Sequence, residues 1–545
     1  MKKSLVTDGD WTTVAKARDV AAEAGERIAT ARRDFLKLFG YGAAGLAMGG
    51  LSVDKDGSPR FMAEAAAMPA PYSPYANAFQ FADRLLYMNI GTTGSSPTRV
   101  IRDFADDYKD IARNPTAYFF GQQEMRNSIA PGFGCDPYEL VLSFNTTDGL
   151  WRIVMGIPFE AGDEIITTNM EEDAGISAVD VLVDRFGVIK KTVDLPTNDA
   201  YSDREVLKRF KAQLTNKTKA VLFSSPIYLT GARLPAKKLC LGAARRGILS
   251  IVDGAHLPGM CAVNLHDMGC DFFSGSGHKW QCGPGQTGFL YIRNGYDPDY
   301  RIVERPTGDF APFGAPSPTV EIGIPGYTNT APLPTYYPTN TLIYGAAGIL
   351  KNGERDPEHN IAAVLQLIGN GSRPSQQALT ECCQLWDTWG REEIEDYVVA
   401  LAQYLRSRIV EIWGPQSLSV PFDGESYPVP EVSRTGLTSF NPFSISRTRP
   451  GRPYHDYNAD LTERQAEAQS GASSTAVATL RDDYQIVIRN NSVPHSLRSD
   501  PSANATLGTF SSPLRVSTHL FHSTSDVDRL IEALLEVVPP LAPPL

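Results

Sequence analysis

The chain has 545 residues, of which 42% are hydrophobic and 21% charged, a composition typical of folded globular proteins. Its formal net charge of −11 argues against nucleic acid or an anionic membrane surface as a main partner. The seven cysteines are odd in number and form no CxxC pair, which argues against a disulfide framework or a zinc ribbon.

The N-terminal segment carries features of an export signal. Arg32 and Arg33 precede a Gly/Ala-rich, weakly apolar run over residues 38–53, and small-residue sites follow that run. This order resembles a twin-arginine (Tat) signal, because the run is too short and too glycine-rich for a good membrane span. The alternative is an amphipathic helix with an incidental Arg-Arg pair. The resemblance implies recognition by the bacterial Tat export machinery, a periplasmic or secreted mature protein without stable membrane insertion, and a bound cofactor.

Strands and helices alternate over residues 101–293. The apolar runs GDEIITTN and KAVLFSSPIYLTG predict strands, and LCLGAARRGILSIVDG predicts a helix followed by a strand. This alternation predicts an α/β fold with a parallel or mixed sheet wrapped by helices. Asn145 and Asp253 directly follow apolar strands, and Lys279 follows the short apolar step CDFFSG. Because ligands of such sheets bind beyond the carboxyl ends of the strands, we expect these residues to meet at one site.

The remainder of the chain is less regular. Nine prolines and several tyrosines lie between Pro298 and Pro338, which predicts an ordered loop over a site or an interface. The stretch from QQALTECC to VEIWG is strongly helical, YQIVIRNN and SPLRVSTHLF predict strands, and STSDVDRLIEALLEVV predicts a final helix capped by Ser523 or Ser525.

These patterns divide the chain into four predicted segments. They are a Tat signal with its linker (1–67), an N-terminal arm (68–100), a large cofactor-binding domain (101–380, with a Pro/Tyr-rich insertion at about 294–345) and a small C-terminal domain (381–545).

The residues at the sheet edge suit an aldehyde cofactor such as pyridoxal 5′-phosphate (PLP). Lys279 can form a Schiff base with the aldehyde, and burial would lower its pKa and favour the reactive amine. Asp253 can keep the pyridine nitrogen protonated, which lets the ring accept electrons. The sequence NTTDG opens a helix, so Thr146 and Thr147 can hold the phosphate there.

Three motifs together carry a resemblance to a known family. IVDGAH is followed about twenty residues later by SGSGHKW and then by GQTGFLYIR, which resembles the class V aminotransferases of PLP fold type I, with the isopenicillin N epimerase-like branch most similar. The resemblance runs from Asn89 to the C-terminus. It implies a large domain with a mostly parallel seven-stranded sheet, a smaller α+β C-terminal domain, PLP as cofactor and a homodimer.

The resemblance also implies roles for single residues around the cofactor. Lys279 and Asp253 keep the roles given above, and His256 lies near the phenolic oxygen of the ring. Five residues are predicted to contact the phosphate, namely Thr146, Thr147, Ser276, His278 and Ser372. Ser372 lies on the GSRPSQQAL loop, which is similar to the loop that reaches the phosphate across a dimer interface in that family. Arg515, in LRVSTHLF, matches the arginine that binds the substrate carboxylate, and its guanidinium suits that group bidentately.

One position departs from the family. In that family, an aromatic ring or a histidine just after the strand that ends in TT stacks on the cofactor. This chain has TTNMEEDAG there, so Glu172 or Asp173 occupies that place. A carboxylate stacks poorly on a ring, although it could act as an acid or base. Thr92 and Thr93, in the N-terminal arm, could contact the substrate or form a turn.

Other readings of these residues carry less support. Lys279 could be a turn residue, and Arg515 an ion-pair residue at a sheet edge. A zinc site at Asp253, His256 and His278 has no metal-spaced fourth ligand, so no metal is expected. Ser276 lacks the G-x-S-x-G frame of a hydrolase nucleophile.

We therefore expect an exported PLP-dependent enzyme that acts at the amino group or α-carbon of an amino acid or amino-acid-derived metabolite. It would be an aminotransferase, epimerase or lyase. Cysteine desulfurase activity is not expected, because that reaction in this family needs a cysteine ahead of the substrate arginine and residues 384–545 contain none. The alternative is a non-catalytic protein of the same fold that binds a ligand or partner, supported by the missing stacking residue.

Overall fold

The computed structural model describes most of the chain that follows the predicted signal. The described residues are 73–116, 121–293, 350–351, 354–355, 361–366, 371–422, 424, 429–443, 463–499 and 506–538. The predicted Tat segment and the predicted Pro/Tyr-rich insertion lie outside them. Residues from Ala66 onward cluster as one compact unit. Among the described helices, none combines the length and hydropathy that a membrane span requires.

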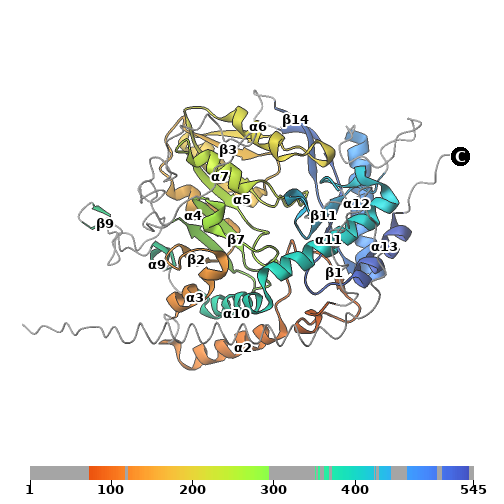
Figure 1. Cartoon of the computed structure of the whole chain (residues 1–545), viewed down its shortest axis with the longest axis horizontal. Coiled ribbons are helices and arrows are strands. Elements are labelled where there is room, and N and C mark those ends of the chain that lie inside the picture. Colours follow the sequence, from red (N-terminus) through yellow and green to blue (C-terminus); the bar gives the residue numbers. More distant parts are fainter. Residues whose placement is uncertain are drawn as a thin grey trace, which may run out of the picture. The chain divides into compact units, whose positions relative to one another are not determined.

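A seven-stranded sheet forms the centre of this unit, and it confirms the predicted α/β class (Figure 1). In spatial order the strands are β2 (Leu140–Ser143), β8 (Gly288–Ile292), β7 (Phe272–Ser276), β6 (Leu249–Asp253), β5 (Thr218–Ser224), β3 (Glu164–Thr168) and β4 (Ile189–Val193). β8 runs antiparallel to both of its neighbours, whereas the other six strands share one direction, so the sheet is mostly parallel. The strands predicted from GDEIITTN, KAVLFSSPIYLTG and LCLGAARRGILSIVDG correspond to β3, β5 and β6.

The helices follow the strands in the expected alternation. They are α2 (Thr98–Arg113), α3 (Gln122–Ile129), α4 (Thr146–Gly156), α5 (Asp173–Phe186), α6 (Asp203–Gln213), α7 (Ala236–Ala244), α8 (Leu265–Met268), α9 (Ile361–Gln366), α10 (Arg373–Trp389), α11 (Arg391–Trp413), α12 (Glu463–Tyr484) and α13 (Thr524–Val537). Ser523 caps α13 through a capping box, which confirms one of the two predicted caps.

Both faces of the central sheet are covered, because successive side chains of a strand point to opposite faces. Val141 packs in one cluster with apolar residues of α4 and α5. Its neighbours Leu140 and Leu142 pack in the other, with apolar residues of α3, α7 and α10. The strands are therefore buried on both sides, as parallel strands in α/β proteins usually are.

The stretch predicted to be strongly helical consists of two helices, α10 and α11. Gly390 separates α10 from α11 with φ of +90°, a backbone conformation that favours glycine. The predicted boundary between large and small domains, at 380/381, falls inside α10. The four-segment division itself stays a prediction.

The C-terminal part has a core of its own. Its three-stranded antiparallel sheet has the order β11 (Leu437–Phe440), β16 (Leu514–Ser517) and β13 (Arg489–Asn490). The other short strands are β1 (Leu86–Tyr87), which pairs in parallel with β12 (Ile486–Val487), the pair β9 (Leu350–Lys351) and β10 (Glu354–Arg355), and the pair β14 (Val493–Ser499) and β15 (Thr506–Ser511). The β1–β12 pair ties the N-terminal arm to the C-terminal strands.

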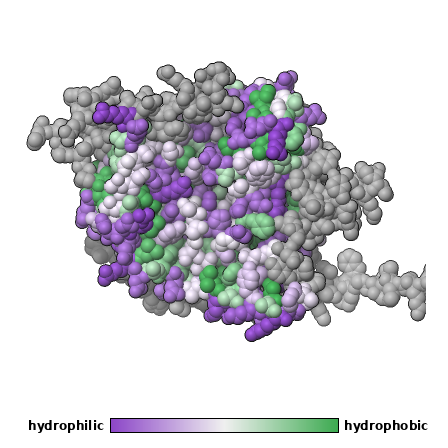
Figure 2. All heavy atoms as spheres, turned by 180° about the vertical axis from the view of Figure 1, so that it is seen from behind, coloured by the Kyte–Doolittle hydropathy of each residue, from purple (hydrophilic) through white to green (hydrophobic). Residues whose placement is uncertain are grey.

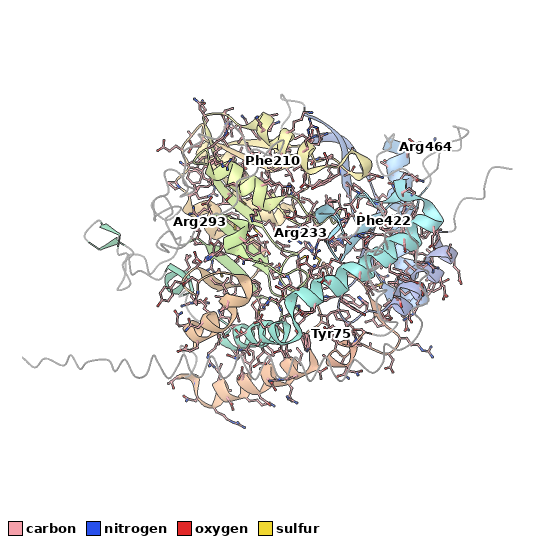
Figure 3. The ribbon with its side chains drawn as sticks, in the orientation of Figure 1. Tyr75, Phe210, Arg233, Arg293, Phe422 and Arg464 are labelled. Atoms are coloured by element: carbon pink, nitrogen blue, oxygen red, sulfur yellow. The ribbon has the colours of Figure 1, made fainter. Side chains whose placement is uncertain are left out.

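Polar contacts join the two parts and aromatic contacts pack within them, and Figure 3 labels Arg233 and Phe210 among the residues involved. Arg233, beyond β5, donates to Glu395 of α11 over 3.2 Å. Phe210 of α6 packs edge-on against Phe223 of β5, with ring centroids 6.0 Å apart. The face in Figure 2 mixes hydrophilic and hydrophobic residues among the described part of the chain.

Candidate active site

A cavity of about 310 Å³ lies at the carboxyl ends of the central strands. Its lining comes from the N-terminal arm (Gly91, Thr92), the start of α4 (Asn145, Thr146, Thr147), the start of α5 (Glu172, Ala174, Gly175), the ends of β5 to β7 and the segments after them (Ser224, Pro226, Tyr228, Asp253, Ala255, His256, Ser276, His278, Lys279) and two C-terminal strands (Arg489, Arg515). Eight of the nine predicted site residues meet here, and the exception is Ser372. Ligands of α/β folds bind at this end of the sheet, beyond the carboxyl ends of its strands.

Lys279 sits three residues beyond β7, on a tight connection to β8. The N–H of Gly277 donates to the carbonyl of Thr287 over 2.9 Å, and the N–H of Gly94 donates to the carbonyl of His278 over 2.7 Å. A Cβ at Gly94 would lie 2.0 Å from the Lys279 carbonyl oxygen, so only glycine allows the arm to pack this closely. The arm and the β7–β8 turn thus hold the backbone of Lys279 while its half-buried side chain faces the cavity.

Asp253 is the last residue of β6 and is buried. Its Oδ1 accepts a hydrogen bond from the N–H of Ala255 over 2.9 Å. Its Oδ2 faces Gly175, where an added Cβ would lie only 2.9 Å away. Burial raises the pKa of Asp253 to about 6, while the Ala255 N–H and the charge of Lys279 oppose this rise.

The start of α4 presents donors to the same cavity. Asn145 caps the helix by accepting from the N–H of Asp148 over 2.8 Å, which leaves the N–H groups of Thr146 and Thr147 without an acceptor among the described residues. The hydroxyls of Thr146 and Ser276 lie 2.7 Å apart. Such a helix start suits an anionic group, because its unpaired N–H groups carry partial positive charge.

Of the two remaining predicted phosphate ligands, His278 lines the cavity and Ser372 lies outside it. His278 Nδ1 is 3.2 Å from the carbonyl oxygen of Thr287, so it donates there, and burial lowers the pKa of this histidine. Ser372 does not line the cavity; it caps α10, and its hydroxyl lies 3.0 Å from that of Tyr108. The role proposed for Ser372, toward a neighbouring subunit, stays a prediction.

His256 is held in one tautomer by Trp280. The indole Nε1–H of Trp280 donates to His256 Nδ1 over 3.0 Å. An indole N–H can only donate, so Nδ1 must be the unprotonated nitrogen and Nε2 carries the hydrogen. Burial lowers the pKa of His256 well below its usual value, which keeps the ring neutral. Trp280, which also packs in the apolar core, is therefore a positioning residue.

Arg515, on β16, is buried with only 1% of its surface exposed. It donates to the Tyr228 carbonyl (3.1 Å), Asn89 Oδ1 (3.2 Å) and Thr92 Oγ1 (3.3 Å). Its Nε has no hydrogen-bond partner within the described part of the chain. A buried guanidinium held only by neutral oxygens, with one donor unused, is suited to receive a carboxylate.

The segment expected to supply a stacking ring supplies a helix cap. Glu172 lines the cavity and caps α5 by accepting from the N–H of Gly175 over 3.2 Å, whereas Asp173 is the first helical residue and is outside the cavity lining. Rings do reach the cavity from Tyr228, His256 and His278.

Sequence reasoning missed three polar residues at this site. Arg489 and Tyr228 line the cavity, and the adjacent Glu171 is buried, with its carboxylate bonded to the hydroxyls of Thr168 and Ser224. Burial raises the pKa of Glu171 to about 7. The acidic run MEEDAG was the one available signal for Glu171, while the other two become visible only through tertiary pairing.

Known proteins are similar to this chain over its cofactor-binding part. Residues 86–307 match the aminotransferase class-V family. The class-V match is supported by isopenicillin N epimerase of Streptomyces clavuligerus, 31% identical over 214 residues that cover 38% of this chain and 53% of that protein. A probable cysteine desulfurase of Mycobacterium leprae is 29% identical over 232 residues, covering 39% of this chain and 53% of that protein. The chain thus spans about half the length of these class-V relatives.

Solved structures show a similar fold over more of the chain than residues 86–307. A C-DES variant with glycine linked to its PLP cofactor superposes with a TM-score of 0.57 at 19% identity, covering 84% of this chain and 97% of that one. An apo cysteine desulfurase of Thermococcus onnurineus superposes with a TM-score of 0.55 at 19% identity, covering 86% of this chain and 99% of that one. The fold is therefore PLP fold type I, as predicted. Because desulfurases occur among the relatives, the expectation that this chain lacks that activity stays a prediction.

The cavity fits PLP by the chemistry of its own donors. It offers an amine at Lys279, a buried carboxylate at Asp253 and unpaired N–H groups at the start of α4, which match the aldehyde, the ring nitrogen and the phosphate of that cofactor.

The pKa of Lys279 predicts how cofactor loading depends on pH. Burial lowers this pKa to about 8, and the carboxylate of Asp253 opposes the shift. Only the unprotonated amine attacks an aldehyde, so the loading rate of cofactor-free protein should rise about tenfold per pH unit below pH 8 and level off above it. Stopped-flow absorbance after mixing with PLP measures this rate. A rate that keeps rising to pH 10, as for an ordinary lysine, would contradict the assignment.

Proposed function

We propose that this protein is a PLP-dependent enzyme that acts at the amino group or α-carbon of an amino acid or an amino-acid-derived metabolite. One observation carries the proposal. Lys279 faces a single cavity together with Asp253, the start of α4 and Arg515, which supply one partner each for the aldehyde, ring nitrogen, phosphate and substrate carboxylate. The class-V match over residues 86–307 supports the same conclusion.

The cofactor is PLP, which when bound supplies an electron-accepting ring that stabilises negative charge at the substrate α-carbon. Asp253 would hold the ring nitrogen, and its burial excludes the water that would compete for that hydrogen bond. Thr146, Thr147 and Ser276 would bind the phosphate at the start of α4. His256 would donate from Nε2 toward the phenolic oxygen, since Trp280 occupies its other nitrogen.

Two residues would act on the substrate itself. Lys279 supplies the amine that binds the cofactor's aldehyde, and the same amine moves the proton of the substrate α-carbon. Its lowered pKa of about 8 suits this work, because a base near the working pH is present partly as free amine. Arg515 would orient the substrate through its carboxylate, and this orientation decides which bond at the α-carbon reacts.

Racemisation, transamination and elimination all fit these residues. Relatives of the chain include the epimerase named above and a hercynylcysteine sulfoxide lyase of Schizosaccharomyces pombe, 26% identical over 219 residues. A panel of amino acids, followed by cofactor absorbance and by mass spectrometry of products, separates the three reactions. Lys279→Ala serves as the inactive control.

The alternative is a non-catalytic protein of this fold that binds a ligand. It is favoured by Glu172, which occupies the place of a stacking ring and caps a helix. The same panel decides between the two. A visible cofactor band that no amino acid or amine perturbs would overturn the enzymatic proposal in favour of binding.

We also propose that the protein is exported by the Tat machinery and acts in the periplasm or outside the cell. The support is the order of Arg32-Arg33, the short apolar run and the small residues after it. In a host with a Tat system, replacing both arginines by lysine should leave the protein in the cytoplasmic fraction. Unchanged export of that variant would contradict the proposal.

A homodimer is the proposed assembly, with Ser372 reaching the phosphate of the neighbouring subunit. Its support is the likeness of GSRPSQQAL to the family's phosphate loop and the absence of Ser372 from its own cavity lining in the described structure. Light scattering of the active protein tests this assembly. A fully active monomer would overturn it.

A further inference from the structure

Two arginines reach the cavity from neighbouring strands of the C-terminal sheet. Arg489 on β13 and Arg515 on β16 are direct partners in the antiparallel register. Directly opposed residues of two antiparallel strands project to the same face of the sheet. Both side chains accordingly line the active-site cavity. Like charges placed opposite each other are destabilising, so this pairing needs an explanation.

The two guanidinium groups converge on one hydroxyl. Thr92 Oγ1 accepts from Arg515 Nη2 over 3.3 Å and lies 3.5 Å from Arg489 Nη1. Among the described residues, the printed partners of the two guanidinium groups are neutral oxygens of Thr92, Asn89 and Tyr228, and neither group forms an ion pair. Burial together with the charge of Arg489 lowers the pKa of Arg515 to about 9. The described protein therefore leaves this end of the cavity short of negative charge.

The acidic residues of the cavity are engaged elsewhere. Asp253, at the end of β6, accepts a hydrogen bond from the Ala255 N–H, and Glu172 accepts one from the Gly175 N–H at the start of α5. Neither forms an ion pair with the two arginines. A ligand bound in the cavity can supply this counter-charge.

The two arginines also lie at different depths. Arg515 is 1% exposed at the inner part of the site, whereas Arg489 and Thr92 are exposed at its mouth. A single carboxylate on Arg515 would leave the outer guanidinium unused. An anion at each depth would satisfy both.

We propose that the substrate is an acidic amino acid, or a metabolite ending in one, whose α-carboxylate binds Arg515 and whose second carboxylate binds Arg489 at the mouth of the cavity. This inference rests on the proposed function, since it assigns the substrate class of the same site.

Dead-end ligands test the second carboxylate without any reaction. Glutarate and its monoamide glutaramate differ by one charge and carry no amine, and succinate and adipate with their monoamides vary the span. Their binding to the full-length protein loaded with PLP is measured by calorimetry. At the span that fits, the diacid should bind the wild type at least roughly tenfold more tightly than its monoamide.

The variants test which arginine holds the second carboxylate. Arg489→Gln should reduce the ratio of diacid to monoamide affinity to near one, Arg489→Lys should restore part of it, and Arg515→Gln should weaken the binding of both ligands. Arg481→Gln, which removes an exposed arginine on α12, is the matched control and should keep the wild-type ratio.

The outcomes separate this inference from the function on which it rests. A ratio near one in the wild type, or a ratio unchanged in Arg489→Gln, overturns the second carboxylate. Equal weakening of diacid and monoamide by Arg489→Gln means that both arginines share one carboxylate, which also overturns it. Failure of the proposed function has a different signature, namely a wild-type protein without the visible cofactor band that Lys279→Ala should abolish.

Discussion

Replacing Lys279 by alanine should abolish the visible absorbance of the bound cofactor and lower turnover by more than roughly a thousandfold. The side chain is the cavity's amine, and it is held there by the arm at Gly94 and by the turn after β7. Because one residue both binds the cofactor's aldehyde and moves the α-proton, its loss removes both functions. Absorbance spectra of the loaded protein and initial rates with the best substrate measure the two effects.

The same variant should fold normally. Burial lowers the pKa of Lys279, so the folded protein does not gain from its charged form, and its loss should leave the melting temperature nearly unchanged. Lys208→Ala is the matched control, because Lys208 is exposed on α6 and pairs only at the surface with Glu205. That control should keep the band and the rate. Turnover within tenfold of wild type in Lys279→Ala would show that another residue performs the reaction.

Asparagine at Asp253 should lower turnover by roughly tenfold to a hundredfold, because a charge-assisted hydrogen bond to the ring nitrogen is replaced by a neutral one. It should also shift the loading profile. The Asp253 carboxylate raises the pKa of Lys279 against burial, so its loss should move the levelling-off point below pH 8. Turnover and the pH dependence of loading are measured on the same preparation.

The stability of the cofactor-free protein gives a third measurement for this variant. Burial raises the pKa of Asp253 to about 6, above the roughly 3.9 of an unfolded chain, so the wild type loses stability as pH rises through about 6. Asp253→Asn should not show this loss. Asp267→Asn, at an exposed surface pair with Lys237, is the control. An unchanged loading profile together with unchanged turnover would mean that Asp253 does not face the cofactor.

Local sequence patterns predicted the part of the site that the central sheet builds. Apolar runs of five to seven residues become strands buried on both faces, and the polar residue after each run must lie at a strand end. This pattern identifies Asp253 and Lys279. The reading of Thr146 and Thr147 as the start of a helix follows from the same logic, with Asn145 as the cap.

The expected roles of two other residues depended on contacts that local patterns do not encode. The indole of Trp280 fixes the tautomer of His256, which lies 24 positions earlier in the chain. Ser372, expected at the phosphate of a neighbouring subunit, caps α10 within its own chain, and its contact across subunits stays a prediction. A side chain's partner across the fold depends on how distant segments pack.

The sequence by itself determined the fold class, the strand edge that carries the site and the lysine with its carboxylate partner. These follow from the period of the apolar residues and from the chemistry of the polar residues that interrupt it. Only the tertiary structure decided which residues reach the substrate end of the cavity. Arg489 stands opposite Arg515 because β13 pairs with β16, and both meet Thr92 because the N-terminal arm pairs with β12. Such pairing depends on long-range register, which a short strand pattern leaves open.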